Sequence, residues 1–178
     1  MNEIKLHLGC GKRYLPGYIN IDISSPTADI HIDVKKLPYP DEYIDEIYAC
    51  HILEHFGRHE YLSVLGEWAR VLKKGKRIYL AVPDLEASFE YYNKHKDITP
   101  LIGQFYGGQK DEFDYHKIGF TFDSMSNALR GIGFDTIERY NSFEYLPKDF
   151  DDYSLSYLPH MDFKNGYHLS LNITGVKK

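Results

Sequence analysis

Short apolar segments of two periodicities follow one another along the chain, and the earliest of them have the pattern of strands. Residues 4–8 are apolar at every second position and lead into a glycine-rich turn, while the next two segments alternate apolar and polar side chains strictly. Two further apolar runs complete this set. The pattern therefore predicts strands at residues 4–8, 18–23, 29–34, 45–50 and 77–82.

Helical periodicity begins between the fourth and fifth of these strands. Residues 59–73 place their apolar side chains on one helical face, and Gly75 is a residue that favours the end of a helix. Residues 84–96 and 123–131 have the same character, and strands are expected at 134–140 and 168–175. Strands that alternate with helices predict an α/β fold in which helices cover both faces of a mostly parallel sheet.

Length and composition limit what the chain can be. Its 178 residues and 43% hydrophobic content suit one globular domain, with residues 84–120 as an insertion that forms an acceptor pocket or lid. A net charge of -5 disfavours general nucleic-acid binding, which needs a clustered basic face. The longest apolar run spans about five residues, far short of a membrane span. No signal peptide is visible, so we expect a cytoplasmic location. The oligomeric state is not predictable from these features.

The turn after the first strand carries the first candidate chemistry. Gly9-Cys10-Gly11 ends a strand, and glycines there would let backbone N–H groups approach a nucleoside ligand at the carboxyl edge of the sheet. Asp22 ends the second strand and could accept both ribose hydroxyls. Asp33 ends the third strand and could accept from an adenine amino group. This ordered set predicts a nucleoside-binding edge.

The same residues belong to longer runs that resemble the class I S-adenosylmethionine (SAM)-dependent methyltransferases. The resemblance is close over residues 4–84 and looser over 116–140, and it is strongest to short members associated with cell-surface polysaccharide clusters. The runs that carry it are Leu-His-Leu-Gly-Cys-Gly at 6–11, Ile-Asp-Ile-Ser at 21–24, Leu-Pro-Tyr-Pro-Asp at 37–41, His-Ile-Leu-Glu-His at 51–55, Glu-Trp-Ala-Arg-Val-Leu-Lys-Lys-Gly at 67–75 and Ala-Val-Pro-Asp at 81–84.

The resemblance implies a fold, a cofactor and a set of roles. The fold is a Rossmann-like seven-stranded sheet of order 3-2-1-4-5-7-6, with the seventh strand antiparallel, and the cofactor is SAM. The roles are carried over by position: the turn of Gly9, Cys10 and Gly11 borders the methionine part, Asp22 takes the ribose, Asp33 and Val34 flank the adenine, and His51 lies near the sulfonium.

This chain also departs from the family pattern around the first turn. His7 stands where most members have an acidic residue, and Arg13 stands in place of a third glycine. Pro16-Gly17 leave room for barely one helical turn before the second strand, which weakens the contribution of a helix dipole. Arg13 is then a candidate partner for the methionine carboxylate.

Methyl transfer to a hydroxyl oxygen of a small or carbohydrate-like acceptor is the activity we expect, with a nitrogen acceptor less favoured. A hydroxyl acceptor requires a general base, for which His51, His116 and Asp84 are candidates. The non-catalytic alternative is a protein that binds SAM or a nucleotide. A dinucleotide dehydrogenase is disfavoured because the chain lacks a complete Gly-x-Gly-x-x-Gly and a second domain.

His51-Ile-Leu-Glu54-His55 also matches the H-x-x-E-H pattern of zinc peptidases. That chemistry needs both histidines on one face of a helix. Because His51 directly follows a strand and Gly57 comes soon after His55, the segment is predicted to be a strand-to-helix junction. A further alternative is that Glu54 and His55 only hold this junction together. We therefore expect no metal.

Overall fold

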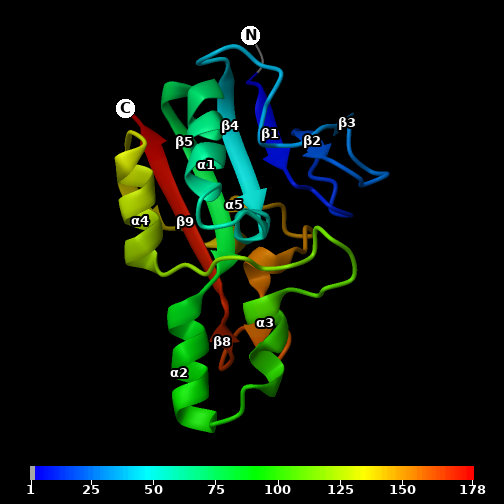
Figure 1. The fold of residues 1–178 in the computed structure, drawn as a ribbon, viewed down its shortest axis with the longest axis vertical. Coiled ribbons are helices and arrows are strands. Elements are labelled where there is room, and N and C mark those ends of the chain that lie inside the picture. Colours follow the sequence, from blue (N-terminus) through cyan, green and yellow to red (C-terminus); the bar gives the residue numbers. More distant parts are fainter. Residues whose placement is uncertain (1–2) are drawn as a thin grey trace.

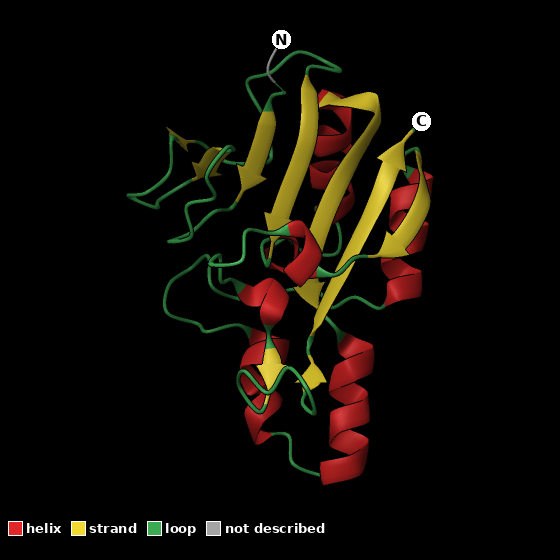
Figure 2. Cartoon of the chain, turned by 180° about the vertical axis from the view of Figure 1, so that it is seen from behind, coloured by secondary structure: helices red, strands yellow, loops and turns green. Residues whose placement is uncertain are grey.

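The computed structural model describes residues 3–178, and its core is a seven-stranded sheet of order β3-β2-β1-β4-β5-β9-β6 (Figures 1 and 2). The first five strands pair in parallel, and β9 is antiparallel to both β5 and β6. This confirms the sheet expected from the resemblance. The strands of the sheet are β1 (Lys5–Leu8), β2 (Ile19–Asp22), β3 (Ile30–His31), β4 (Ile44–Cys50), β5 (Leu72–Pro83), β6 (Phe134–Arg139) and β9 (Ser170–Lys177).

One face of the sheet is covered by two amphipathic helices, α1 (Tyr61–Val71) and α4 (Phe122–Gly131), as Figure 1 shows. Trp68 of α1 and Met125 of α4 are fully buried among the apolar residues of the central strands. The indole N–H of Trp68 donates to the carbonyl of Val34 at 2.9 Å, so the buried polar atom is satisfied. Thr121 caps α4, and its side chain accepts the N–H of Ser124.

The opposite face is covered differently because no helix separates β1 from β2. Residues 9–18 form turns, which confirms that Pro16-Gly17 leave no room for a full helix. A second core cluster fills the space, with Leu15 and Tyr48 buried against Leu146. The short helix α5 (Ser142–Tyr145) contributes Tyr145, whose ring stacks on Tyr79 at 3.8 Å between centroids.

The end of α1 was predicted wrongly. The helix ends at Val71, and Leu72 is already extended and begins β5. Gly75 lies inside the β5 segment with φ +73°, where the pairing with β4 shifts from Ile44 opposite Leu72 to Glu46 opposite Arg77. The glycine therefore accommodates an irregularity in the strand rather than a helix C-cap.

Beyond the carboxyl ends of the central strands the chain forms an extension, at the bottom of Figure 1. Its elements are α2 (Leu85–His95), the single 3-10 turn Thr99–Leu101, α3 (Ile102–Tyr106) and a ribbon of β7 (Tyr157–Leu158) with β8 (Tyr167–His168). Tyr91 of α2 packs edge-on against Tyr167 of β8, with 5.3 Å between ring centroids. Over residues 3–178, the structure contains no helix with the length and hydropathy that crossing a membrane requires.

Candidate functional site

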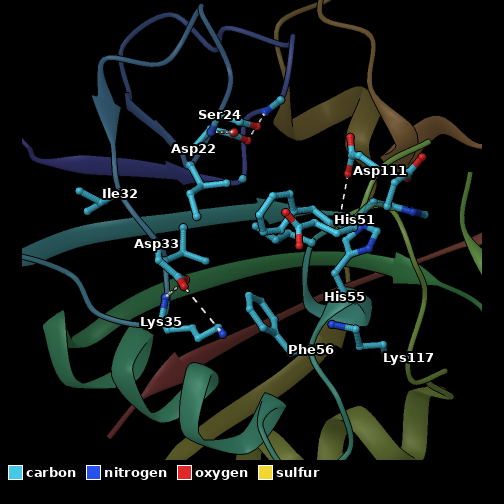
Figure 3. Close-up of a pocket in the computed structure, with 18 of the residues that line it drawn as sticks. Asp22, Ser24, Ile32, Asp33, Lys35, His51, His55, Phe56, Asp111 and Lys117 are labelled. Carbon is cyan, nitrogen blue, oxygen red and sulfur yellow. Dashed lines mark hydrogen bonds and ion pairs between the residues drawn. The ribbon is translucent and has the colours of Figure 1, made fainter. Parts of the chain in front are cut away.

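A cavity of about 660 Å³ opens at the carboxyl ends of β1, β2 and β4 (Figure 3). Its volume falls within the usual range of small-molecule sites. Most of the residues predicted to hold a cofactor line it together: Gly9, Gly11, Asp22, Asp33, Val34 and His51. The structure thus brings these residues together at one cavity, while their roles towards a cofactor stay a prediction.

Gly9 serves packing more than ligand approach. It has φ +66°, and a Cβ added there would lie 2.1 Å from Cδ1 of Ile52. The N–H groups of Gly9 and Cys10 both donate to the carbonyl of Ile21, at 2.8 and 3.1 Å. The expectation that these N–H groups face a ligand is therefore wrong, because the pairing of β1 with β2 continues past the strand end. Cys10 itself is 3% exposed and does not line the cavity.

Asp22 holds the glycine turn in place. One carboxylate oxygen accepts the N–H of Gly11 at 2.9 Å, and the other accepts those of Ser24 and Ser25 at 2.9 and 2.8 Å. The side chain remains in the cavity wall, where Figure 3 shows it beside Ser24. A carboxylate has about four acceptor sites, and three of them already receive N–H groups, so one site remains for a ligand hydroxyl, on the oxygen that accepts from Gly11.

The adenine end of the predicted site is formed by Asp33, Val34 and Lys35. Asp33 lies two residues beyond the end of β3, rather than at the strand end where the sequence predicts it. The Asp33 carboxylate accepts the N–H of Lys35 at 2.9 Å, and the Lys35 ammonium lies 3.8 Å from its other oxygen. Ile32 and Phe56 add apolar surface to the same wall. The region thus combines flat apolar contacts with polar groups at its edge, as a heteroaromatic ring requires.

His51 is held in the cavity wall at the end of β4. Its backbone has φ +49°, its Nε2 lies 3.1 Å from the hydroxyl of Ser170, and its Nδ1 lies 3.2 Å from Oε1 of Glu54. Glu54 is fully buried in a single 3-10 turn, Leu53–His55. Burial by itself would raise the pKa of this carboxyl, but the nearby imidazoles, His51 foremost, lower it below its ordinary value. The motif is thus not part of an α-helix, which removes the geometric basis of the peptidase alternative.

The other two candidate bases lie outside the residues that line the cavity. Asp84 caps α2 by accepting from Glu86 and Ala87, and it pairs with Arg139 at 3.1 Å. His116 packs edge-on against His55, with 5.0 Å between ring centroids, and its Nδ1 lies 2.9 Å from the carbonyl of Gln104. Burial lowers the pKa of His116.

Residues 84–120 were expected to form an acceptor pocket or lid, and part of this insertion lines the cavity, although its individual cavity-lining residues were not predicted. Lys110, Asp111, Glu112, Phe113, Asp114 and Lys117 face the cavity from the side opposite the glycine turn. Nothing in the local pattern distinguishes these residues from an exposed loop, because only the path of the chain brings them over the sheet. Arg13, the predicted partner of the methionine carboxylate, does not line the cavity and instead pairs with Asp151 at the surface, at 3.5 Å. The cation that lines the cavity near the glycine turn is Lys12.

Comparison with known proteins finds similarity to methyltransferases. Residues 6–80 match the sequence model of a methyltransferase domain. The chain is also similar to the ubiquinone/menaquinone biosynthesis C-methyltransferase of Bordetella avium, with 22% identity over 118 residues, which cover 61% of this chain and 44% of the relative. The matched region thus spans less than half of that relative's length.

Solved structures with the same fold include two SAM-dependent methyltransferases from archaea. The one from Archaeoglobus fulgidus has a TM-score of 0.60 and 16% identity, over 98% of this chain and 86% of its own. The one from Methanosarcina mazei has a TM-score of 0.59 and 16% identity, and the match covers 99% of this chain and 94% of that protein. A possible histamine N-methyltransferase from Thermotoga maritima has a TM-score of 0.59 and 17% identity, over 98% and 82%. The match of residues 6–80 and the observed sheet order thus show that the chain is similar to methyltransferase domains in sequence over that region and shares the fold of these solved structures.

Proposed function

We propose that this chain transfers the methyl group of SAM to a hydroxyl oxygen of a small or carbohydrate-like acceptor. The observation that carries the proposal is the two-sided cavity, with Gly9, Gly11, Asp22 and Asp33 on one wall and the polar residues of the insertion on the other. One wall is suited to the cofactor. The other faces the space in which an acceptor would bind.

The cofactor side fits SAM by the chemistry of its groups. Asp22 accepts a ribose hydroxyl at its remaining acceptor site, and the wall of Ile32, Asp33 and Val34 receives the adenine. Lys12 lies near enough to the glycine turn to meet the methionine carboxylate. Bound SAM supplies an activated methyl group for in-line displacement. The contribution of the protein is then alignment of the acceptor and exclusion of water.

The acceptor side favours a polyhydroxylated molecule. Asp111, Glu112 and Asp114 offer carboxylates that accept hydroxyl protons, and Phe113 offers an aromatic face. These groups suit a sugar ring, which presents hydroxyls at its rim and C–H groups on its faces. A hydrophobic acceptor would leave the carboxylates without partners. Residues 84–120 thus act as the acceptor-binding insertion.

His51 is the candidate base that the cavity wall contains, and we assign it the proton of the acceptor hydroxyl. Asp84 is engaged as a helix cap and ion pair, and His116 lies behind His55. The proton passes to Nε2 of His51, which exchanges its contact with Ser170 for the acceptor.

Radiolabelled SAM with panels of sugars, sugar phosphates and phenols tests this function. We expect label in a sugar-containing product, and we expect His51→Ala to reduce turnover at least a hundredfold with little change in SAM affinity. His160→Ala, at an exposed position, is the matched control. Transfer only to phenols or amines would refute the acceptor class. Full turnover by His51→Ala would show that His51 is not the general base.

A further inference from the structure

Glu54 is a buried carboxylate whose oxygens make no well-aligned hydrogen bond, although imidazole nitrogens lie near one of them. Its side chain is fully enclosed, and both carboxylate oxygens lack a hydrogen-bond partner. The imidazole nitrogens within 4.0 Å are Nδ1 of His51 at 3.2 Å and Nε2 of His116 at 3.8 Å, both facing Oε1. Burying a carboxylate without such partners costs several kcal/mol unless a cation compensates it. A cation held against Glu54 would offset this cost more fully than the neighbouring imidazoles do.

Two histidines beside Glu54 are oriented in the manner of metal ligands. Nδ1 of His55 lies 3.1 Å from the carbonyl of Tyr115, and Nδ1 of His116 lies 2.9 Å from the carbonyl of Gln104. A carbonyl oxygen only accepts, so each Nδ1 carries the proton and each Nε2 keeps its lone pair. Ligating histidines are typically fixed by this kind of bond to a backbone carbonyl, which sets both the tautomer and the direction of the ring.

The three side chains converge on one point. One ligand atom each from Glu54, His55 and His116 lies within 4.8 Å of the other two. Ligands in a tetrahedral zinc site are separated by about 3.3 Å, given bonds of about 2.0–2.1 Å. The observed separations thus exceed those of a zinc site by at most about 1.5 Å.

We propose that Glu54, His55 and His116 form a binding site for one divalent transition-metal ion, with Zn²⁺ the best match. Two imidazoles and a carboxylate suit zinc and neighbouring metals better than Mg²⁺ or Ca²⁺, which prefer oxygen ligands. His55 also lines the cavity, so the fourth ligand position would face the space assigned to the acceptor. His51 is not assigned as a ligand, because its Nε2 lies 3.1 Å from the hydroxyl of Ser170 and it is not among the three side chains whose ligand atoms lie within 4.8 Å of one another.

The site joins two parts of the chain that are distant in sequence. Glu54 and His55 come from the turn after β4, and His116 comes from the insertion, whose carbonyls at Gln104 and Tyr115 hold the two rings. A bound ion would therefore fasten the insertion over the cavity. The proposal departs from the metal-free protein expected from sequence, and it does not depend on methyl transfer.

Calorimetric titration of the chelator-treated, tag-free full chain with ZnCl₂ tests the site. We expect about one ion per chain with micromolar or tighter affinity, weakened at least tenfold in His55→Ala, His116→Ala and Glu54→Gln. His160→Ala removes an exposed histidine and should bind as the wild type does. Circular dichroism establishes that each variant is folded.

Zinc K-edge absorption of the zinc-loaded wild type identifies the ligand atoms directly, without relying on variants that could misfold. The site predicts two imidazole nitrogens at about 2.0–2.1 Å, with oxygen completing the shell. Stoichiometry far below one, or equal binding by the wild type and all three variants, would overturn the proposal. The cluster would then be an ion pair between Glu54 and protonated histidines.

Discussion

Gly9→Ala tests the finding that the glycine turn is built around Ile52. The new Cβ would lie 2.1 Å from Cδ1 and 2.8 Å from Cβ of Ile52, and the backbone has φ +66°. The left-handed conformation costs an alanine about 1–2 kcal/mol, and overpacking adds about 1–3 kcal/mol. We therefore expect Gly9→Ala to lower the free energy of unfolding by about 2–5 kcal/mol.

Gly11→Ala is the matched control for this prediction. Gly11 has φ +51°, but nothing lies within 4 Å of its added Cβ, so the conformational cost of about 1–2 kcal/mol applies alone. Urea unfolding at equilibrium, followed by circular dichroism, measures both variants. Ile52→Ala in the Gly9→Ala background should recover part of the loss by removing the closest atoms. Equal destabilisation in the two single variants, with no recovery, would refute the packing role of Gly9.

Three further predictions concern other residues of the sheet and its edge. Asp22→Ala should weaken SAM binding at least tenfold by calorimetry, since a charge-assisted contact is worth about 1.5–3 kcal/mol, whereas Asp135→Ala on β6 should not. The pKa of Asp45 is lowered to about 2 by the N–H of Ile4 and by Lys73. Its stabilising effect is therefore present above the ordinary pKa of 3.8 and lost as pH falls towards 2. Asp45→Asn should cost about 1–2 kcal/mol at pH 7 and almost nothing at pH 2, by urea unfolding. Gly75→Ala should destabilise by about 1–2 kcal/mol, because Gly75 has φ +73°; no loss would contradict the assigned backbone.

The fold was predictable because its signals are local and repeated. Each strand of the parallel half carries its own alternating or apolar run, and the order of strands and helices restricts the topology to few choices. The end of α1 was not predictable in the same way. Lys73 to Arg77 read equally well as the basic last turn of a helix or as the irregular start of a strand, and the pairing with β4 decides between them.

The candidate site was predictable where it depends on strand ends. Gly11, Asp22 and Asp33 meet because parallel strands end at the same edge, and this follows from their order in the sequence. The burial of Glu54 and the approach of His116 depend instead on how the insertion folds back. His55 and His116 also contact the carbonyls of Tyr115 and Gln104, and a pattern of residue types does not predict such bonds to the backbone.

Calorimetry of the wild-type chain with SAM, its demethylated product and NAD tests the central claim most directly. The cavity that joins Gly9, Gly11, Asp22 and Asp33 predicts binding of SAM and of its product in the micromolar range, with about one ligand per chain. It predicts no comparable binding of NAD, because the turn lacks the third glycine and Arg13 stands in its place. Binding of NAD without binding of either adenosyl ligand would contradict the account.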